Sequence, residues 1–218
     1  MNAPNTRGMK ALDLFCGAGG ATKGLQRAGF HVTGIDLKRQ PRYCGDAFIQ
    51  ADALNPPVDI RQFDFVWASP PCQRYTALKS VFDSSKYEDL VEPVRLMLTK
   101  SGVQFVMENV VGAPLRVDLM LCAAAFGLRS YRHRIFEANF FLCGMEHPKH
   151  KTPVNRRKKN RREHWDAGGF VTVVGDIGSY VGPEAMGIDW MTGNELSQAI
   201  PPVYSEYIAH QFLAQVAA

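Results

Sequence analysis

The sequence predicts an α/β protein built on a mostly parallel sheet with helices packed on both of its faces. Short apolar segments with strand character alternate with segments of helical spacing over the first 130 residues. This alternation is typical of parallel sheets, in which each crossover between strands carries a helix. The chain has 218 residues, of which 46% are hydrophobic and 21% charged. It is therefore long enough for one globular domain with a sizeable core.

Individual elements follow from the spacing of apolar residues and from the glycines and prolines that interrupt them. The second half of the chain is expected to hold a β-hairpin over 131–142 with its turn near 138–139, an apolar strand over 170–174 and an amphipathic helix over 204–216. In the first half we expect strands over 10–15, 31–36, 63–68 and 104–107, and helices over 22–28 and 87–99. Pro93 either kinks the last of these helices or marks its first turn.

Several protein classes are disfavoured by composition. No stretch approaches the roughly 18 consecutive apolar residues of a membrane helix, and residues 1–8 do not resemble a secretory signal. Five cysteines, an odd number, are spread along the chain without the spacing of a disulfide framework: Cys16, Cys44, Cys72, Cys122 and Cys143. We therefore expect a cytoplasmic protein.

The positive charge is concentrated in one segment. The net charge is only +4, yet eight Lys and Arg residues and no acid lie between Lys149 and Arg162. Residues 143–169 are basic, polar and poor in hydrophobic periodicity, which indicates an insert carried by the sheet. Such a run is either a solvated loop or a contact for a polyanion, and the sequence leaves both open.

Two features indicate a nucleoside site. Residues 13–20 (DLFCGAGG) join a strand to a helix through closely spaced glycines, which let a ligand approach the main chain. Asp36 ends the next strand, where a carboxylate can accept hydrogen bonds from ribose hydroxyls. Asp52 could similarly hold an adenine amino group. A surface acid at a strand end is the plainer interpretation of either residue.

Cys72 and Glu108 are the candidates for catalysis. Pro70 and Pro71 form a stiff loop after a strand, and this loop presents Cys72 as a nucleophile. Glu108 follows an apolar strand, where partial burial suits a carboxyl group to proton donation. Because the glycine turn, Asp36, Cys72 and Glu108 all fall at strand ends, we expect them to meet at one edge of the sheet.

Five motifs in order resemble those of the cytosine carbon-5 DNA methyltransferase family over most of the chain. They are residues 13–20, the nucleophile loop 70–76 (PPCQRYT), the acid motif 108–110 (ENV), the strand 132–136 (RHRIF) and the late segment 198–203 (QAIPPV). The resemblance implies a Rossmann-like fold that uses S-adenosylmethionine. It implies a catalytic domain over 1–137, a small target-recognition insert over 138–182, and a segment over 183–218 that packs back on the sheet.

The resemblance also implies roles for individual residues. Cys72 would attack carbon 6 of a cytosine flipped out of double-stranded DNA, and Glu108 would act at ring nitrogen 3. Arg134, supported by Arg132, would hold the carbonyl at carbon 2. The cofactor would be bound by Phe15, Cys16, Gly17, Ala18, Gly20, Asp36, Leu37, Asp52 and Pro71. The DNA would be bound by Gln73, Arg156, Arg157, Lys158, Lys159, Arg161 and Arg162. We expect a monomer.

The chain departs from the family pattern at three points. Ser130 stands where the family usually has glutamine, and the Gly-Asn pair expected after the late motif occurs upstream instead, as Gly193-Asn194. The region between Phe136 and about Gly182 is short for target recognition, which suggests a short or degenerate recognition sequence. Compact chains of this kind resemble members encoded by bacteriophages.

The sequence leaves three alternatives open, two for the function and one for a metal site. An RNA cytosine methyltransferase would share the scaffold and could use the basic run equally well, and a nucleic-acid-binding protein could retain the scaffold without turnover. Cys143, His147 and His150 are possible zinc ligands, but structural zinc sites nearly always have four. With no clear fourth ligand, we expect no metal.

Overall fold

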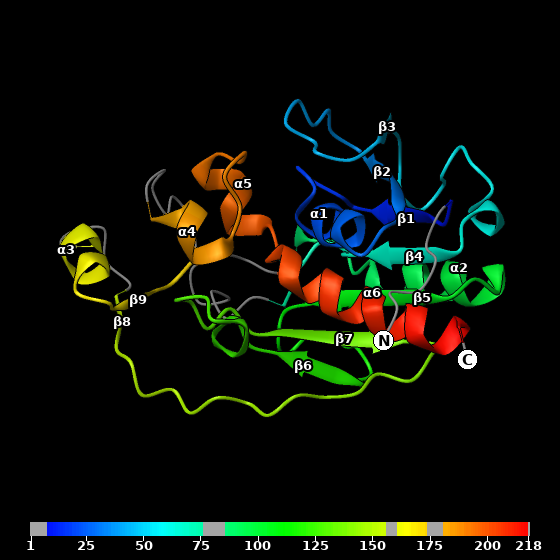
Figure 1. Cartoon of the computed structure of the whole chain (residues 1–218). Helices are drawn as coiled ribbons and strands as arrows, with labels where there is room; N and C mark the ends of the chain where they lie inside the picture. Colours follow the sequence, from blue (N-terminus) through cyan, green and yellow to red (C-terminus); the bar gives the residue numbers. More distant parts are fainter. Residues whose placement is uncertain (1–7, 76–85, 156–160, 174–180, 218) are drawn as a thin grey trace.

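The computed structural model describes residues 8–75, 86–155, 161–173 and 181–217. Its main feature is a seven-stranded sheet of order β3-β2-β1-β4-β5-β7-β6 (Figure 1). Strands β1 to β5 pair in parallel, whereas β7 is antiparallel to both of its neighbours. The strands are β1 (Lys10–Leu14), β2 (His31–Asp36), β3 (Ala47–Gln50), β4 (Phe65–Ala68), β5 (Phe105–Asn109), β6 (Leu119–Leu121) and β7 (Arg134–Ala138). The predicted mostly parallel sheet is confirmed.

Helices cover both faces of the sheet, as predicted. Along β4, Phe65 and Trp67 face the core shared with α1 (Gly20–Arg27) and α6 (Pro202–Val216). Val66 and Ala68 face the opposite core, which includes α2 (Val91–Ser101). This alternation has the period of two that a strand buried on both faces requires.

Helices α1 and α6 approach each other closely. A Cβ atom on Gly24 would lie 2.0 Å from the carbonyl oxygen of Pro202, so only glycine fits there. Ser205 lies at the same contact and donates a 2.7 Å hydrogen bond to the carbonyl of Ala21. This contact fixes the C-terminal helix against the helix that follows the glycine turn.

Two predicted elements differ from the structure. Helix α2 begins at Val91 rather than at residue 87, and Pro93 lies in its first turn. The hairpin predicted over 131–142 is wrong. Strand β7 covers only Arg134–Ala138, and it pairs with β5 and β6. The backbone of β7 is satisfied by strands distant in sequence, so no local return strand is needed.

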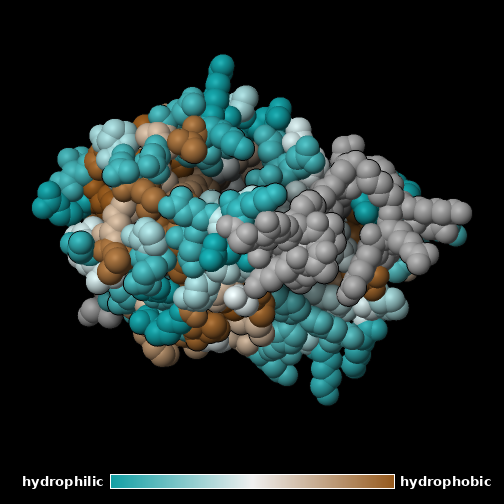
Figure 2. Space-filling model, turned by 180° about the vertical axis from the view of Figure 1, so that it is seen from behind, coloured by the Kyte–Doolittle hydropathy of each residue, from teal (hydrophilic) through white to brown (hydrophobic). Residues whose placement is uncertain are grey.

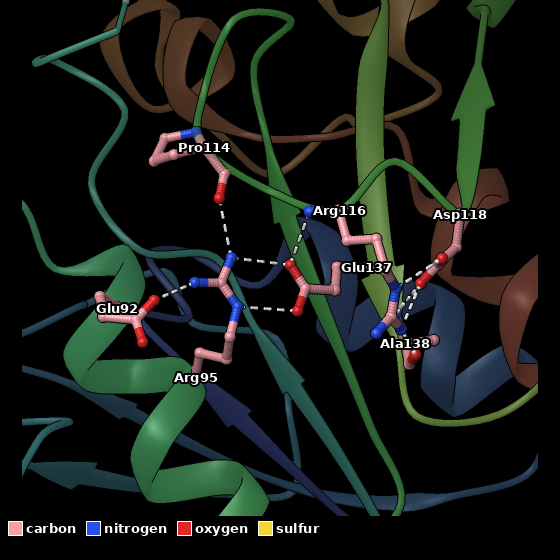
Figure 3. A network of polar contacts seen from close by, with 7 residues as sticks. All are labelled: Glu92, Arg95, Pro114, Arg116, Asp118, Glu137 and Ala138. Atoms are coloured by element: carbon pink, nitrogen blue, oxygen red, sulfur yellow. Dashed lines mark hydrogen bonds and ion pairs between the residues drawn. The ribbon is translucent and has the colours of Figure 1, made fainter.

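A polar network connects β7 to helix α2 (Figure 3). The carboxylate of Glu137 accepts two 2.8 Å hydrogen bonds from Arg95 of α2 and one of 2.9 Å from the amide of Arg116. Burial tends to raise the pKa of Glu137, but the bonds from Arg95 and Arg116 outweigh it and lower the pKa. Arg95 also pairs with Glu92, which lies at the solvent side of the network.

A small lobe follows the sheet. A segment without helix or strand, residues 139–153, runs from β7 past β6 to this lobe (Figure 1). The lobe contains β8 (Val154–Asn155) and β9 (Phe170–Val171), which pair in parallel, and the helices α3 (Arg161–Asp166), α4 (Gly182–Met186) and α5 (Gly193–Gln198). The strand predicted over 170–174 is thus shorter than expected in its described part. Two short 3₁₀ helices, η1 (Ile60–Gln62) and η4 (Ala123–Phe126), complete the described elements.

The coloured surface in Figure 2 is mostly hydrophilic, with hydrophobic residues in separate patches between the hydrophilic ones. Most large apolar residues lie instead in three buried clusters, two on the faces of the sheet and one in the lobe. Among the described residues, no helix is both long enough and apolar enough to span a membrane.

Candidate active site

The turn after β1 has an unusual backbone. Phe15 has a φ of 61°, the left-handed region that a bulky residue rarely enters, and Gly17 has a φ of 50°. A Cβ atom on Gly17 would meet nothing within 4 Å, so this glycine borders open space. Gly19 differs, because a Cβ there would lie 2.7 Å from the sulfur of Cys44. The turn therefore combines a main chain exposed to a ligand with tight packing behind it.

Asp36 lies beside this turn at the end of β2. One carboxylate oxygen accepts a 2.9 Å hydrogen bond from the amide of Gly17, and the other accepts one of 2.9 Å from the amide of Lys38. These bonds hold the carboxylate at the cavity edge, where each oxygen retains capacity for another donor. The next residue, Leu37, is an apolar side chain that is 69% exposed at the same edge.

Asp13 is a buried acid beneath the turn. One of its carboxylate oxygens accepts a 2.5 Å hydrogen bond from the hydroxyl of Thr22. The other is buried without a hydrogen-bond partner, and the residue lines the cavity. Burial raises the pKa of Asp13 to about 7, against the opposing effect of Thr22.

The loop that carries Cys72 is held by side chains from two strands. Asn109, buried at the end of β5, donates a 3.0 Å hydrogen bond from its side-chain amide to the carbonyl of Pro70. Trp67 of β4 donates from its indole nitrogen to the hydroxyl of Ser69, at 2.9 Å. The start of the rigid proline pair is thus attached to the sheet at two points, so the thiol is presented from a fixed base.

Glu108 and Arg134 form an ion pair next to this loop. Arg134 donates from Nε to Oε1 of Glu108 at 2.8 Å, and the two side chains are 12% and 7% exposed. Burial raises the pKa of the Cys72 thiol, Arg134 acts to lower it, and Glu108 acts to raise it. Arg134 and Glu108 therefore have opposite effects on the pKa of the candidate nucleophile.

These groups share one cavity of about 370 Å³ at the carboxyl edge of the parallel strands. The predicted convergence of the glycine turn, Asp36, Cys72 and Glu108 is confirmed. Every predicted cofactor residue lines the cavity, as do Gln73 and Arg134. The sequence did not single out three further polar residues at its wall, Lys38, Gln40 and Glu195, and it named Gln198 only as the start of the late motif. Glu195 and Gln198 belong to α5, which only the return of the chain brings to this edge.

Arg132 is positioned differently from Arg134. Its guanidinium donates to the carbonyls of Val173 at 2.6 Å, Ser197 at 2.8 Å and Ala199 at 2.8 Å. Burial, followed by the neighbouring Arg134, lowers the pKa of Arg132 to about 9. Arg132 is not among the described residues that line the cavity. These bonds join the lobe and the C-terminal segment to β7, which makes Arg132 a positioning residue.

The basic run is only partly described. Arg156, Arg157, Lys158 and Lys159 lie outside the described residues. Arg161 begins α3 and is only 6% exposed. It is therefore less exposed than we expect of a residue that contacts a phosphate. Arg162 is exposed and pairs with Asp166 at 2.9 Å. Asn194, whose role the sequence left open, lies at the start of α5 and is not among the residues that line the cavity.

Comparison with known proteins finds a family model that is similar to most of the sheet region. The family model of C-5 cytosine-specific DNA methylases matches residues 9–114. This part of the chain is similar to that family. The matched region contains the glycine turn, Asp36, Cys72 and Glu108, and it ends before Arg132 and Arg134.

Curated relatives match a similar region. The Type II methyltransferase M1.HphI of Haemophilus parahaemolyticus is 30% identical over 119 residues, which are 45% of this chain and 32% of that protein. The Type II methyltransferase M.AgeI of Thalassovita gelatinovora is 31% identical over 121 residues, 48% of this chain and 28% of that protein. The chain thus spans about a third of the length of the curated relatives it matches.

A solved structure matches over nearly the whole chain. A prophage-encoded protein of E. coli, assigned as a DNA modification methyltransferase, aligns with a TM-score of 0.64 at 15% sequence identity. The alignment covers 96% of this chain and 100% of that one. At this identity the likeness shows the fold alone, and it agrees with the Rossmann-like fold expected from the sequence.

The cavity suits S-adenosylmethionine, the cofactor that the family implies. Asp36 offers carboxylate oxygens for ribose hydroxyls, and the exposed Leu37 offers an apolar surface for a base. The unpartnered oxygen of Asp13 can accept a hydrogen bond from a cationic amino group. Gly17 leaves the main chain open to such a ligand. The residues present therefore fit a cationic nucleoside.

Proposed function

We propose that the protein is a DNA (cytosine-5-)-methyltransferase that methylates a flipped cytosine through a covalent Cys72 adduct. The observation that carries this proposal is the position of the Cys72 thiol. It lies in the same cavity as the Glu108–Arg134 ion pair and the nucleoside-binding edge of the sheet. Bound S-adenosylmethionine would supply an electrophilic methyl group at that edge.

The residues support a balanced sequence of steps. Cys72 gives its proton to water and its thiolate adds to carbon 6 of cytosine, while Glu108 protonates or hydrogen-bonds ring nitrogen 3. This addition makes carbon 5 nucleophilic, so that it can accept the methyl group, and S-adenosylhomocysteine would be the leaving group. Water then removes the proton of carbon 5, the carbon–sulfur bond breaks to release the thiolate, and ring nitrogen 3 returns any proton it received to Glu108, which leaves the methylated base.

Arg134 serves two purposes in this scheme. Its bond to Glu108 fixes the orientation of the acid, and its positive charge favours the thiolate of Cys72. Since a cytosine within a duplex is inaccessible to these groups, the base must leave the stack. Double-stranded DNA is the proposed substrate, and we propose Gln73, which lines the cavity, as a contact to it.

Bisulfite sequencing of host DNA after expression tests the chemistry and the site together. We expect methylated cytosines in one short sequence context with the wild-type chain and none with Cys72→Ala. A covalent complex should also form between the wild-type protein and DNA that contains 5-fluorocytosine, because fluorine blocks the final elimination. Methylation by Cys72→Ala at the wild-type level would overturn the proposed nucleophile. Transfer of radiolabelled methyl groups to RNA, with none to DNA, would establish the RNA alternative.

A further inference from the structure

One thiol and three imidazoles gather outside the cavity described above. The ligand atoms of Cys122, His133, His147 and His150 all lie within 4.8 Å of one another. None of the four belongs to the lining of the proposed active site. The cluster therefore needs an explanation independent of methyl transfer.

The sheet itself brings two of these residues together. In the antiparallel ladder of β6 and β7, Leu121 pairs with Arg134. Continuing that register by one residue on each strand places Cys122 opposite His133. Cys122 is buried, with an exposure of 2%. The pair thus has a fixed geometry at the point where both strands end.

The other two residues come from the extended segment 139–153, which passes this end of the sheet on its way to the lobe (Figure 1). Within it, His147 and His150 are exposed at their outer sides. Their imidazoles nevertheless face the sheet. The Nε2 atoms of His147 and His133 are 2.9 Å apart, and Nε2 of His150 lies 3.5 Å from the sulfur of Cys122.

These separations are close to those of a tetrahedral metal site. With zinc bonds of about 2.3 Å to sulfur and 2.0–2.1 Å to nitrogen, tetrahedral angles put ligand atoms roughly 3.3–3.6 Å apart. The Cys122–His150 separation of 3.5 Å falls in this range, and the His133–His147 separation of 2.9 Å is slightly short. Small rotations of the exposed imidazoles are sufficient to bring the distances between the ligand atoms into this range.

Neighbouring groups hold the ligands in place. The ring of Tyr131 stacks on that of His150 with centroids 3.6 Å apart and an interplanar angle of 16°. The hydroxyl of Tyr131 also donates a 2.9 Å hydrogen bond to the carbonyl of Thr152 and accepts one of 3.2 Å from its amide. Orientation of metal-binding imidazoles by such surrounding contacts is usual.

We propose that Cys122, His133, His147 and His150 form a structural zinc site. One thiolate and three imidazoles suit zinc by ligand softness, and four protein ligands make a closed site. The metal would fasten the segment 139–153 to the end of β7, immediately beside Arg134. It would thereby fix the lobe relative to the active site, since this segment has no helix or strand of its own.

This assignment revises the ligand set suggested by the sequence. His147 and His150 remain, but Cys143 is exposed and does not belong to the cluster. Its place is taken by Cys122, and His133 supplies the fourth ligand. Neither of these could be singled out from spacing, because both come from the β6–β7 ladder. Cys143 therefore serves as a matched control.

The test measures metal content in protein without a histidine tag, expressed with added zinc and purified by gel filtration. Mass spectrometry of the metal should find roughly one zinc per chain in the wild type and in Cys143→Ser. Cys122→Ser and His147→Ala should lose most of it. His147 is exposed, so its substitution tests the site even if Cys122→Ser does not fold. Wild-type protein without zinc, or equal zinc in all four proteins, would overturn the proposal.

Cobalt substitution identifies the coordination directly. The cobalt-loaded wild type should show the visible bands of a tetrahedral site and a near-ultraviolet sulfur-to-cobalt band, and the latter should disappear in Cys122→Ser. Chelation should increase protease cleavage within 139–153. If the sulfur band persists in Cys122→Ser and disappears in Cys143→Ser, the ligand assignment is wrong.

Discussion

Nε of Arg134 lies 2.8 Å from Oε1 of Glu108, and both side chains are nearly buried in the cavity that holds Cys72. The two charges act on the thiol with opposite signs, because Arg134 favours the thiolate and Glu108 opposes it. The same ion pair therefore both orients the proposed acid and influences the ionisation of the proposed nucleophile, whose pKa is raised mainly by burial.

The first prediction concerns the reactivity of Cys72. Burial raises its pKa, so alkylation by iodoacetamide should be slow at neutral pH and should accelerate as pH rises. Arg134→Gln should slow alkylation further, and Glu108→Gln should speed it. Each unit of pKa change alters the thiolate fraction about tenfold below the pKa. Peptide-resolved mass spectrometry measures the rates, with the exposed Cys143 as internal reference. A shift in the same direction for both variants would contradict the electrostatic explanation.

The second prediction concerns Asp36. Asp36→Ala should weaken binding of S-adenosylmethionine about tenfold or more, because a carboxylate acceptor is lost at the cavity edge. Asp59→Asn is the matched control, since Asp59 is an exposed acid outside this cavity. Calorimetry gives both affinities, and the melting temperatures show whether the turn at Gly17 is still formed. Unchanged affinity in Asp36→Ala would return Asp36 to the role of a surface acid.

The third prediction concerns Asp13 and pH. Burial raises its pKa in the folded protein to about 7, from the ordinary value of 3.8 for an aspartate. The folded state therefore keeps a proton that the unfolded state releases, and stability falls as pH rises between these values. Asp13→Asn removes this effect while retaining an acceptor for Thr22. Its melting temperature should rise relative to wild type between pH 5 and pH 8, in the absence of cofactor.

The same variant should bind S-adenosylmethionine more weakly, because the unpartnered oxygen that would accept from the cationic amine is changed in charge. A difference in melting temperature that stays constant from pH 5 to pH 8 would show that the pKa of Asp13 is not raised. If Asp13→Asn binds S-adenosylmethionine as tightly as wild type, Asp13 does not contact the cofactor. That outcome would leave the prediction on pH and stability unchanged.

The fourth prediction concerns the basic run. If it binds phosphates, the slope of log affinity against log salt should be about −0.9 per contact. Replacing Arg156, Arg157, Lys158 and Lys159 by alanine should flatten this slope and weaken all DNA sequences about equally. Site preference should survive, because phosphate contacts position a protein while base contacts specify the sequence.

Arg161 offers a contrast within the same run. Its side chain is buried, so Arg161→Ala should lower the melting temperature and change the salt slope little. Binding of the quadruple variant with the wild-type affinity and slope would identify the run as a solvated loop.

Much of the active site was predictable because its residues occupy the ends of parallel strands. Strand direction and sheet order place such ends at one edge whatever the details of packing. The positions of Asp36, Cys72 and Glu108 therefore followed from local patterns of apolar residues, glycines and prolines. Their chemical roles remain predictions.

Tertiary structure alone decided which of two arginines faces the cavity. Arg132 and Arg134 are only two residues apart, Arg134 at the start of β7 and Arg132 just before it, yet Arg134 meets Glu108 while Arg132 bonds to backbone carbonyls of the lobe and the C-terminal segment. Tertiary structure also decided the cluster of Cys122, His133, His147 and His150. This cluster depends on the register of the β6–β7 ladder and on the path of the extended segment 139–153. The sequence determined what meets at the strand ends, since that arrangement needs only local periodicity and strand direction. Contacts between segments distant in the chain were decided by packing, because their free energy depends on neighbours that local sequence does not specify.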